Sequence, residues 1–470
     1  MAISLDVTGV LKAAAFWVSN KGGKNGRKLF LYFYLLLTGI SLVVGNDPVI
    51  RTFFCMYIAS ALIIWHPVSG TVFLVYYTEA TSLIPLPWLV SEFAAANTAS
   101  MVLFVGNPTN VVICEGFGIN NAAFTAYTIL PFVGCCVACL AGLAFQFRDP
   151  VHVPKKLQIS CHLDPLSVLR DRVGAIVGTV LLVVCLVVTI ALSFFHIDVW
   201  KIVLPFAIAK FVFDLAWDHY RFTHQDATHS IEVPSDEDMK KKIKRSATFD
   251  ADTPSTTVTA VAHSETSEKI DEAAPPQRLE RTQSELEKRF FPNLRPKLHT
   301  LAGHFPTFST TLPRLPFGLI PFAFSQFILI EALAHRNWID LFAEWLVKAS
   351  HRQMIPTIWL IGVLGVILCN GAGTNIGATI LLTKVIRAVP QMPDDTLRAA
   401  AISLAVASNI GAVSFTFSAS LAGLLWDSIL KQKKVTISQR TFAFWNTLPL
   451  LLMTGVGLAI VTAEMVVLYR

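Results

Sequence analysis

Apolar residues occur along this chain in stretches longer than the helices of ordinary soluble proteins require. A helix needs about 17–25 apolar residues to cross a membrane, because the hydrocarbon layer is about 30 Å thick. Stretches near that length lie at 28–45, 122–147, 174–195, 199–216, 354–369 and 446–468, and shorter or interrupted ones lie at 70–78, 86–105, 312–333, 373–387 and 397–426. The pattern predicts an all-α polytopic membrane protein with about ten transmembrane or partial helices.

Clusters of Gly, Asn, Pro, Thr and Ser interrupt the apolar stretches in both halves of the chain. The front clusters are Gly45-Asn46-Asp47-Pro48, Asn97-Thr98-Ala99-Ser100 and Gly106-Asn107-Pro108-Thr109-Asn110, and the back clusters lie at 369–377 and 408–420. Irregular backbone at membrane depth survives only where it is buried in protein or lines a wet cavity. Breaks in corresponding positions of two halves are typical of the binding site of a secondary transporter. We therefore predict a secondary active membrane transporter.

Composition agrees with a membrane protein. The 470 residues are 53% hydrophobic and 15% charged, with a mean hydropathy of +0.56, whereas soluble proteins carry about 25% charged residues. The net charge is +6, but the cations flank apolar stretches. Because such placement sets membrane orientation, we expect the lipid bilayer as surroundings and no nucleic-acid partner.

The sequence offers little support for an enzyme. It contains neither a Gly-x-x-x-x-Gly-Lys-Ser/Thr nucleotide motif nor a His-Glu-x-x-His zinc motif, so we expect no catalytic residues, no bound metal and no cofactor beyond a coupling H⁺ or Na⁺. The eight cysteines are scattered without a disulfide framework. Cys136 and Cys139 form a C-x-x-C pair open to a redox or metal role. Their position within an apolar stretch favours simple packing.

Composition also divides the chain into three parts. Residues 223–311 are rich in Ser, Thr, Glu and Lys and poor in large apolar side chains, so we expect a disordered loop. It separates a front transmembrane half, 1–222, from a back transmembrane half, 312–470. Cations in the short segment 431–440 predict that this segment faces the cytoplasm, and we place the long loop on the same side.

Asp47 is the acid embedded in a break, between Asn46 and Pro48. An ionisable group at membrane depth is costly and is a functional candidate by default. We expect Asp47 to couple transport to an ion, with a helix cap at the water interface as the alternative.

Amide and hydroxyl groups at the breaks are the candidate substrate ligands, because they can hydrogen-bond a small polar solute without burying a charge. The alternative is that such residues only join helices to one another. The predicted ligands are Asn46, Asn97, Thr98, Asn107, Thr109, Asn110, Asn370, Thr374, Asn375, Asn409, Thr416 and Ser418.

These motifs resemble those of the bacterial arsenite efflux pumps (the ArsB family), within a wider superfamily that includes citrate and dicarboxylate carriers. The resemblance covers about Ala13 to Lys155 and Leu312 to the C-terminus. It rests on Asn46-Asp47, on the clusters at 97–100 and 106–110, and on the segment 417–426 followed by Ile437-Ser438. It implies two inverted repeats with discontinuous helices, and exchange of arsenite or antimonite for protons.

The chain departs from that family in several places. Bacterial relatives carry acids where this chain has Asn97 and Asn409, and a Lys where it has Val413. Relatives also begin with about three further spans and have no counterpart of the apolar segment 51–68, which is either a retained intron or an insertion. The missing charges put proton coupling and arsenite specificity in question.

Two kinds of transport therefore stay open. We favour proton-coupled efflux of an arsenite- or antimonite-like metalloid or small anion, and the alternative is a sodium- or proton-coupled citrate or dicarboxylate carrier. A channel is a further alternative. We expect the plasma membrane, with a vacuolar or other internal membrane as the alternative, and a homodimer as one possible assembly.

Overall fold

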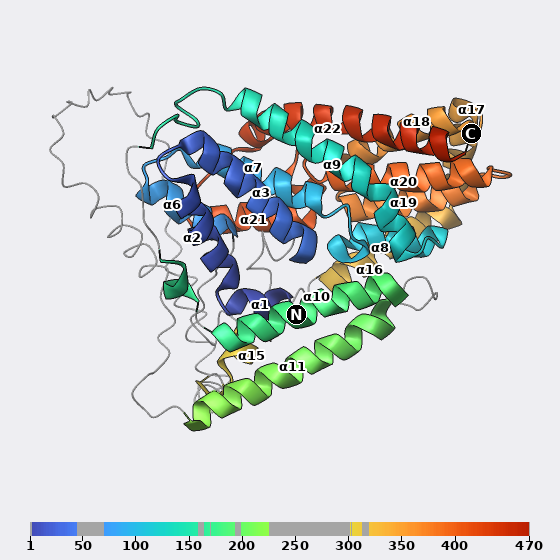
Figure 1. Ribbon diagram of the computed structural model, residues 1–470. Coiled ribbons are helices and arrows are strands. Elements are labelled where there is room, and N and C mark those ends of the chain that lie inside the picture. Colours follow the sequence, from blue (N-terminus) through green and yellow to red (C-terminus); the bar gives the residue numbers. More distant parts are fainter. Residues whose placement is uncertain are drawn as a thin grey trace, which may run out of the picture.

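The computed structural model describes residues 2–44, 70–157, 164–169, 171–192, 199–224, 301, 303–312 and 319–469, and within these ranges every regular element is helical (Figure 1). This confirms the predicted all-α class. Asn46, Asp47, the segment 51–68 and most of 223–311 lie outside the described residues. The described end of that loop contains helix α15, Pro306–Thr311. The three-part division of the chain stays a prediction.

The front half contains a series of long and short helices. They are α1 (Ala2–Val7), α2 (Val10–Gly22), α3 (Gly26–Val44), α6 (Gly70–Ala80), α7 (Pro85–Ala99), the 3₁₀ turn η1 (Phe104–Gly106), α8 (Pro108–Phe117), α9 (Asn121–Gln146), η2 (Pro165–Val168), α10 (Arg172–Leu192) and α11 (Val199–His224).

The back half continues with helices of similar kinds. They are α16 (Leu319–His335), α17 (Trp338–Ser350), α18 (Met354–Gly371), α19 (Asn375–Ala388), α20 (Asp394–Gly411), η5 (Phe417–Ala419), α21 (Leu421–Gln432) and α22 (Gln439–Leu468).

Five helices among the described residues are long and apolar enough to cross a membrane, namely α3, α9, α10, α18 and α22. Four of them match the long apolar stretches at 28–45, 122–147, 174–195 and 354–369, and the fifth contains the stretch at 446–468. The protein is thus a multi-pass membrane protein, as the apolar pattern predicted. The short helices α6, α19 and α21 come from the interrupted stretches at 70–78, 373–387 and 397–426, whereas α8 follows the break at 106–110 and lies outside the predicted stretches.

The two halves repeat one order of elements. In the front half α3, α6, α7, η1, α8 and α9 follow one another, and in the back half α18, α19, α20, η5, α21 and α22 do so. The backbone repeats as well: Asn107, which caps α8, has φ −149° and ψ 141°, and Ser420, which caps α21, has φ −146° and ψ 153°. This correspondence supports the predicted pair of repeats.

The halves are joined by close packing of α9 on α22, which run side by side (Figure 1). A Cβ atom added at Gly134 would lie 2.2 Å from Ile460 Cδ1, and one at Gly457 would lie 2.9 Å from Cys135 Sγ. Glycine at both positions therefore lets the helices approach closely. Cys139 in the same helix is fully buried, and both it and Cys136 are free thiols.

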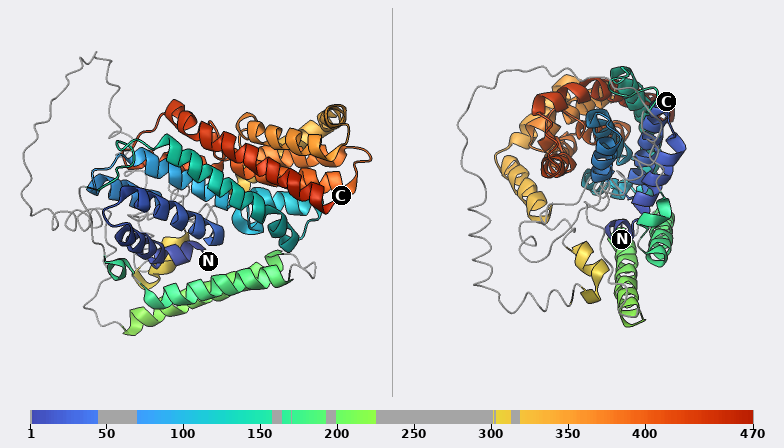
Figure 2. Two further views of the ribbon diagram at one scale, coloured as in Figure 1. Left: turned by 45° about the horizontal axis from the view of Figure 1, so that its top comes forward. Right: turned by 90° about the vertical axis from the view of Figure 1, so that its left-hand side faces the viewer.

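Helices α10 and α11 pack on each other at one side of the molecule, as the left view of Figure 2 shows. Short helices α1 and α15 contact this pair. Asp218 of α11 accepts hydrogen bonds from the backbone N–H and hydroxyl of Thr307, at 2.8 and 2.9 Å. The candidate site lies in the main bundle.

Candidate functional site

Three short helices begin at one small pocket. It is lined by Asn107, Pro108, Asn375, Ile376, Ser420, Leu421 and Ala422, and we call it the helix-start pocket. These residues stand at the first turns of α8, α19 and α21. Each helix has a side-chain cap: Asn107 Oδ1 accepts from Thr109 N at 3.2 Å, Thr374 Oγ1 from Gly377 N at 3.3 Å, and Ser420 Oγ from Gly423 N at 3.0 Å.

The pocket combines electropositive helix ends with little free space. Helix N-termini carry positive partial charge, so three of them facing one point favour an anion or the oxygen atoms of a polar solute. The free volume is about 10 Å³, which is about what one water molecule needs. A larger solute therefore requires the surrounding helices to move apart.

Beside the pocket, three asparagines from the two halves form one buried hydrogen-bonded group, the amide cluster of Asn107, Asn110 and Asn409. Asn409 Oδ1 accepts from Asn107 Nδ2 at 3.1 Å, and Asn409 Nδ2 donates to Asn110 Oδ1 at 2.8 Å. Ser100 Oγ donates to the same Asn409 oxygen at 2.8 Å. All four side chains are at most 5% exposed. Helix α20 of the back half thus bonds directly to the front break.

Asn110 also donates hydrogen bonds to backbone carbonyl groups at the break. Helix α7 ends at Ala99, which leaves carbonyl groups without helical partners, and such groups must find donors at membrane depth. Asn110 Nδ2 donates to the carbonyl oxygens of Ser100 and Leu103, at 2.8 Å each. The sequence pattern Gly-Asn-Pro-Thr-Asn therefore supplies both a helix cap and a support for the chain before it.

The polar residues of the back break form a separate group, the back cluster of Asn370, Thr416 and Ser418. Asn370 Oδ1 accepts from the Thr416 hydroxyl at 2.9 Å, and Ser418 Oγ donates to Thr416 Oγ1 at 3.2 Å. Asn370 Nδ2 donates to Ser414 Oγ at 2.7 Å. The three members are half-buried. Their described bonds stay within the back half.

The remaining predicted ligands occupy varied positions. Thr109 is fully buried and accepts from Ser408 Oγ at 3.3 Å, across the two halves. Asn375 Nδ2 donates to the Ser408 carbonyl at 3.3 Å. Asn97 and Thr98 bond back to carbonyls of their own helix, α7, at 2.9 and 2.7 Å. The structure thus gathers Asn107, Thr109, Asn110, Asn375 and Asn409 around one place, with Thr374 capping the adjacent helix.

Sequence reasoning passed over one buried acid, Glu92 of α7. It is the acid within the apolar stretch 86–105, and a charged side chain in such a stretch is itself a signal of function. Glu92 lies outside the break motifs, whereas Asp47 lies inside one. Glu92 is fully buried, and Thr71 Oγ1 of α6 donates to its Oε1 at 3.0 Å.

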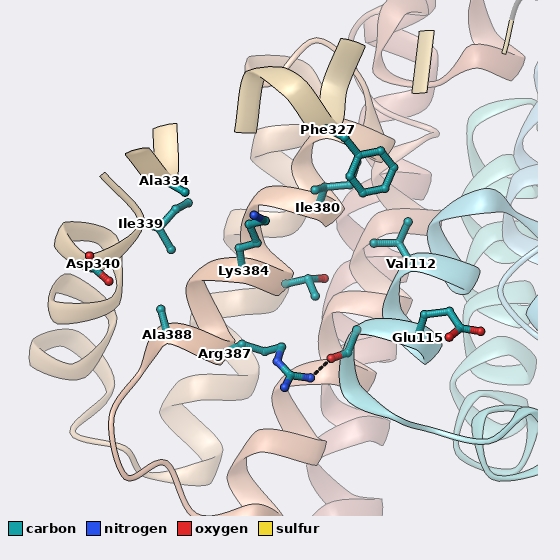
Figure 3. A pocket seen from close by; sticks show the side chains of 12 residues that line it. Val112, Glu115, Phe327, Ala334, Ile339, Asp340, Ile380, Lys384, Arg387 and Ala388 are labelled. Atoms are coloured by element: carbon teal, nitrogen blue, oxygen red, sulfur yellow. Dashed lines mark hydrogen bonds between the residues drawn. The ribbon is translucent and has the colours of Figure 1, made fainter. Parts of the chain in front are cut away.

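A larger open cleft of about 730 Å³ lies elsewhere, between α8, α16, α17 and α19 (Figure 3). Lys384 of α19 pairs there with Glu331, and the guanidinium of Arg387 donates to the Gly116 carbonyl. The rest of the lining contains Glu115, Asp340 and Thr383 beside six apolar side chains, and it includes none of the predicted ligands. We therefore place the candidate site at the helix-start pocket and the amide cluster.

The donor set of the candidate site is one of amides and hydroxyls. Among the residues that the structure describes, no group of three or more His, Cys, Asp or Glu side chains could hold a metal ion. Six described cysteines are free thiols, spread over α8, α9, α10 and α18. The site chemistry is therefore hydrogen bonding and helix-end polarity, which suits a small oxygen-bearing solute.

Comparison with known proteins gives a consistent result. Residues 1–221 match the model of the citrate transporter family CitMHS. The arsenical pump membrane protein of Escherichia coli K12 is 26% identical over 212 residues, which are 45% of this chain and 46% of that protein. The protein of the same name from Yersinia enterocolitica is 28% identical over 215 residues, again 45% and 46% of the two chains.

The alignments cover about half the length of the curated relatives that the chain matches. They agree with the resemblance that the break motifs and the segment 417–426 indicated, which is thereby confirmed. This chain is an all-helical multi-pass membrane protein similar to the arsenical pump membrane proteins and to the citrate transporter family.

Proposed function

We propose that the protein is a secondary active transporter whose substrate binds at the helix-start pocket and the amide cluster. The observation that carries the proposal is the bonding of Asn409, from the back half, to Asn107 and Asn110 of the front half. Alternating access around a fixed site needs groups from both repeats. This amide cluster supplies them at the point where helices are broken.

The closed geometry supports a specific mechanism. With free volume for about one water molecule, the site admits a solute only if bonds between the halves are exchanged for bonds to the substrate. Amides suit such an exchange, because each offers both a donor and an acceptor. Substrate binding would then release α20 from the front break and allow the halves to move.

The favoured substrate is a metalloid hydroxide, such as arsenite or antimonite, or a small anion. The relatives named as arsenical pump membrane proteins support it. Proton entry against an exported neutral solute would contribute about 2.3 kcal/mol per 100 mV and about 1.4 kcal/mol per pH unit. A potential of about 100 mV can thus sustain a gradient of more than tenfold, and one pH unit can sustain a gradient of about tenfold.

Citrate or another dicarboxylate is the second candidate. The match of residues 1–221 to the citrate transporter family favours it, and three helix N-termini at one pocket suit a carboxylate. The expected plasma-membrane location, the possible homodimer and the choice of H⁺ or Na⁺ stay predictions.

The test is transport by purified protein in lipid vesicles, with arsenite, antimonite, citrate and succinate supplied in turn. Asn375→Leu removes an amide that lines the pocket and should lower the apparent affinity for the true substrate about five- to 150-fold, because a buried polar partner is lost. Asn446→Leu is the matched control, since Asn446 of α22 is fully buried but donates to Phe442 of its own helix. Equal effects of the two variants, or no transport of any of the four solutes, would count against the proposal.

A further inference from the structure

Glu92 is buried without a described counter-charge. Its Oε1 accepts the bond from Thr71, while its Oε2 is buried and has no hydrogen-bond partner among the described residues. None of the ion pairs found in the described part of the chain includes Glu92. Moving an ionised carboxylate out of water without a partner has a large free-energy cost. A carboxyl group buried in this way is therefore stable only when it carries a proton.

The surroundings of Glu92 come from both halves. The indole group of Trp426 of α21 lies near the Glu92 carboxyl group, but Trp426 Nε1 is buried and has no hydrogen-bond partner among the described residues. The Trp426 ring packs on Phe93 and Phe442, with centroids 5.2 and 5.7 Å apart. These aromatic rings help to shield the carboxyl group from water, and Glu92 is fully buried. A donor from the back half is thus near an acceptor of the front half, without a completed bond.

The charged groups on neighbouring helices are engaged elsewhere. Lys431 of α21 pairs with Asp427 at 2.6 Å, and Lys433, just after α21, donates to the Tyr76 hydroxyl of α6 at 2.8 Å. None of the ion pairs found in the described part of the chain joins Glu92 to a charged side chain on α3, α6, α9, α20 or α22, the helices packed on α7.

Glu92 also lies on the helix that leads to the candidate site. Ser100 lies eight positions after Glu92 in the chain, and its hydroxyl donates to Asn409 in the amide cluster. At 1.5 Å per residue this is about 12 Å along α7. A movement of α21 or α7 that changes the Glu92–Trp426 contact therefore moves the same helix that ends at the amide cluster.

We propose that Glu92 is the proton-binding group that couples transport to the proton gradient. Thr71 and Trp426 donate hydrogen bonds to the carboxylate when Glu92 is ionised. The inference rests on the proposed function. When the Glu92 surroundings open to water, the O–H bond of the acid breaks, the proton passes to water, and the electron pair stays on the carboxylate. The indole N–H of Trp426 then completes its bond to that carboxylate, which draws the two halves into the other arrangement.

Two measurements on the full-length protein in vesicles test this step. The first compares substrate exchange without a gradient against net accumulation driven by an imposed pH gradient. Wild-type protein should accumulate substrate up to about tenfold per pH unit. Glu92→Gln, which imitates the protonated acid, should keep exchange but accumulate nothing above the uncoupled level. Glu92→Asp should restore accumulation with an altered pH dependence.

Glu464→Gln is the matched control. Glu464 of α22 also has a buried oxygen without a hydrogen-bond partner, but the residue is partly exposed and lies outside the α7–α21 contact. It should accumulate substrate like wild type. Gradient-driven accumulation by Glu92→Gln would overturn the inference. Loss of gradient-driven accumulation in both Glu92→Gln and Glu464→Gln would overturn it as well.

The second measurement is independent of substrate. Infrared difference spectra between acidic and alkaline buffer should show the carbonyl band of a protonated carboxylic acid that Glu92→Gln removes. If wild-type protein moves none of the four solutes, the proposed function fails, and this band still reports whether Glu92 binds a proton. An unchanged band in Glu92→Gln would refute proton binding by Glu92, even in a protein that transports.

Discussion

The two helix breaks follow the same backbone course but differ in how their side chains are bonded. At the front break, Asn107 and Asn110 are buried and bond to Asn409 of the other half. At the back break, Asn370 and Thr416 are half-buried and bond to each other within one half. The front break is thus bonded to the opposite repeat, whereas Asn370, Thr416 and Ser418 can rearrange without losing a described hydrogen bond between the halves.

The helix pairs that correspond in the two repeats also differ in the side chains that join them. In the back half, α19 and α20 are joined by the neutral amide of Asn375, which donates to the Ser408 carbonyl. In the front half, α6 and α7 are joined by Thr71 and the acid Glu92. At this pair of helices the back repeat supplies the amide of Asn375 to the helix-start pocket, and the front repeat supplies the acid Glu92. Variants of matched residues can test this division of roles.

The largest expected effect is on stability, from Asn409→Ala. Its removal leaves Ser100, Asn107 and Asn110 each without one partner, and each loss costs about 1–3 kcal/mol, so we expect destabilisation of about 3 kcal/mol or more. The counterpart Asn370→Ala should cost less, about 1–3 kcal/mol, because it leaves one buried partner, Ser414, unpaired while water can reach the half-buried Thr416. Denaturant unfolding in detergent micelles measures both. Similar losses of unfolding free energy in the two variants would contradict the proposed difference between the front and back breaks.

The second effect concerns the two candidate acids. Asp47 lies outside the described residues, and its role in coupling stays a prediction from its place in a break. The break motif predicts that Asp47→Asn reaches the membrane in normal amounts and loses gradient-driven flux, whereas the Glu92 proposal predicts that this variant keeps the flux. Measurement in the same vesicles as Glu92→Gln distinguishes the two. An Asp47→Asn variant with unchanged pH dependence would make Asp47 structural and leave Glu92 as the coupling acid.

The sequence predicted the fold well because apolar length and helix breaks are local properties. The stretches at 122–147 and 174–195 became α9 and α10 almost residue for residue. The site was predicted only in part, because hydrogen bonding between distant segments is not a local property. Asn97 and Asn110 look equivalent in sequence, yet one bonds back to its own helix and the other reaches Asn409. No spacing rule distinguishes them without the packing of α7 on α20.

A smaller effect should follow from Thr71→Val, which removes the donor to Glu92 and keeps the side-chain shape. The Thr71 hydroxyl stabilises the ionised carboxylate, so without it the proton is held more firmly and release requires a higher pH. A bond to a charged group contributes about 1.5–3 kcal/mol, which corresponds to an upward shift of the transport pH profile by about 1–2 units. Thr379→Val is the matched change in α19, where the hydroxyl donates to Asn375 of its own helix. It should leave the profile in place, and a shift of equal size there would contradict the assignment.

The smallest effect is expected from deletion of residues 240–290, between the two halves. The halves contact each other through α9 and α22 and through Asn409, so their assembly should not depend on the length of the segment that connects them. A flexible connection adds little to the free energy of association once it is long enough. The deleted protein should therefore insert and exchange substrate like wild type, and protease should cut the intact protein first in this segment, from the cytoplasmic side. Loss of exchange after the deletion would show that contacts made by this segment, and not the interface alone, hold the two repeats in register.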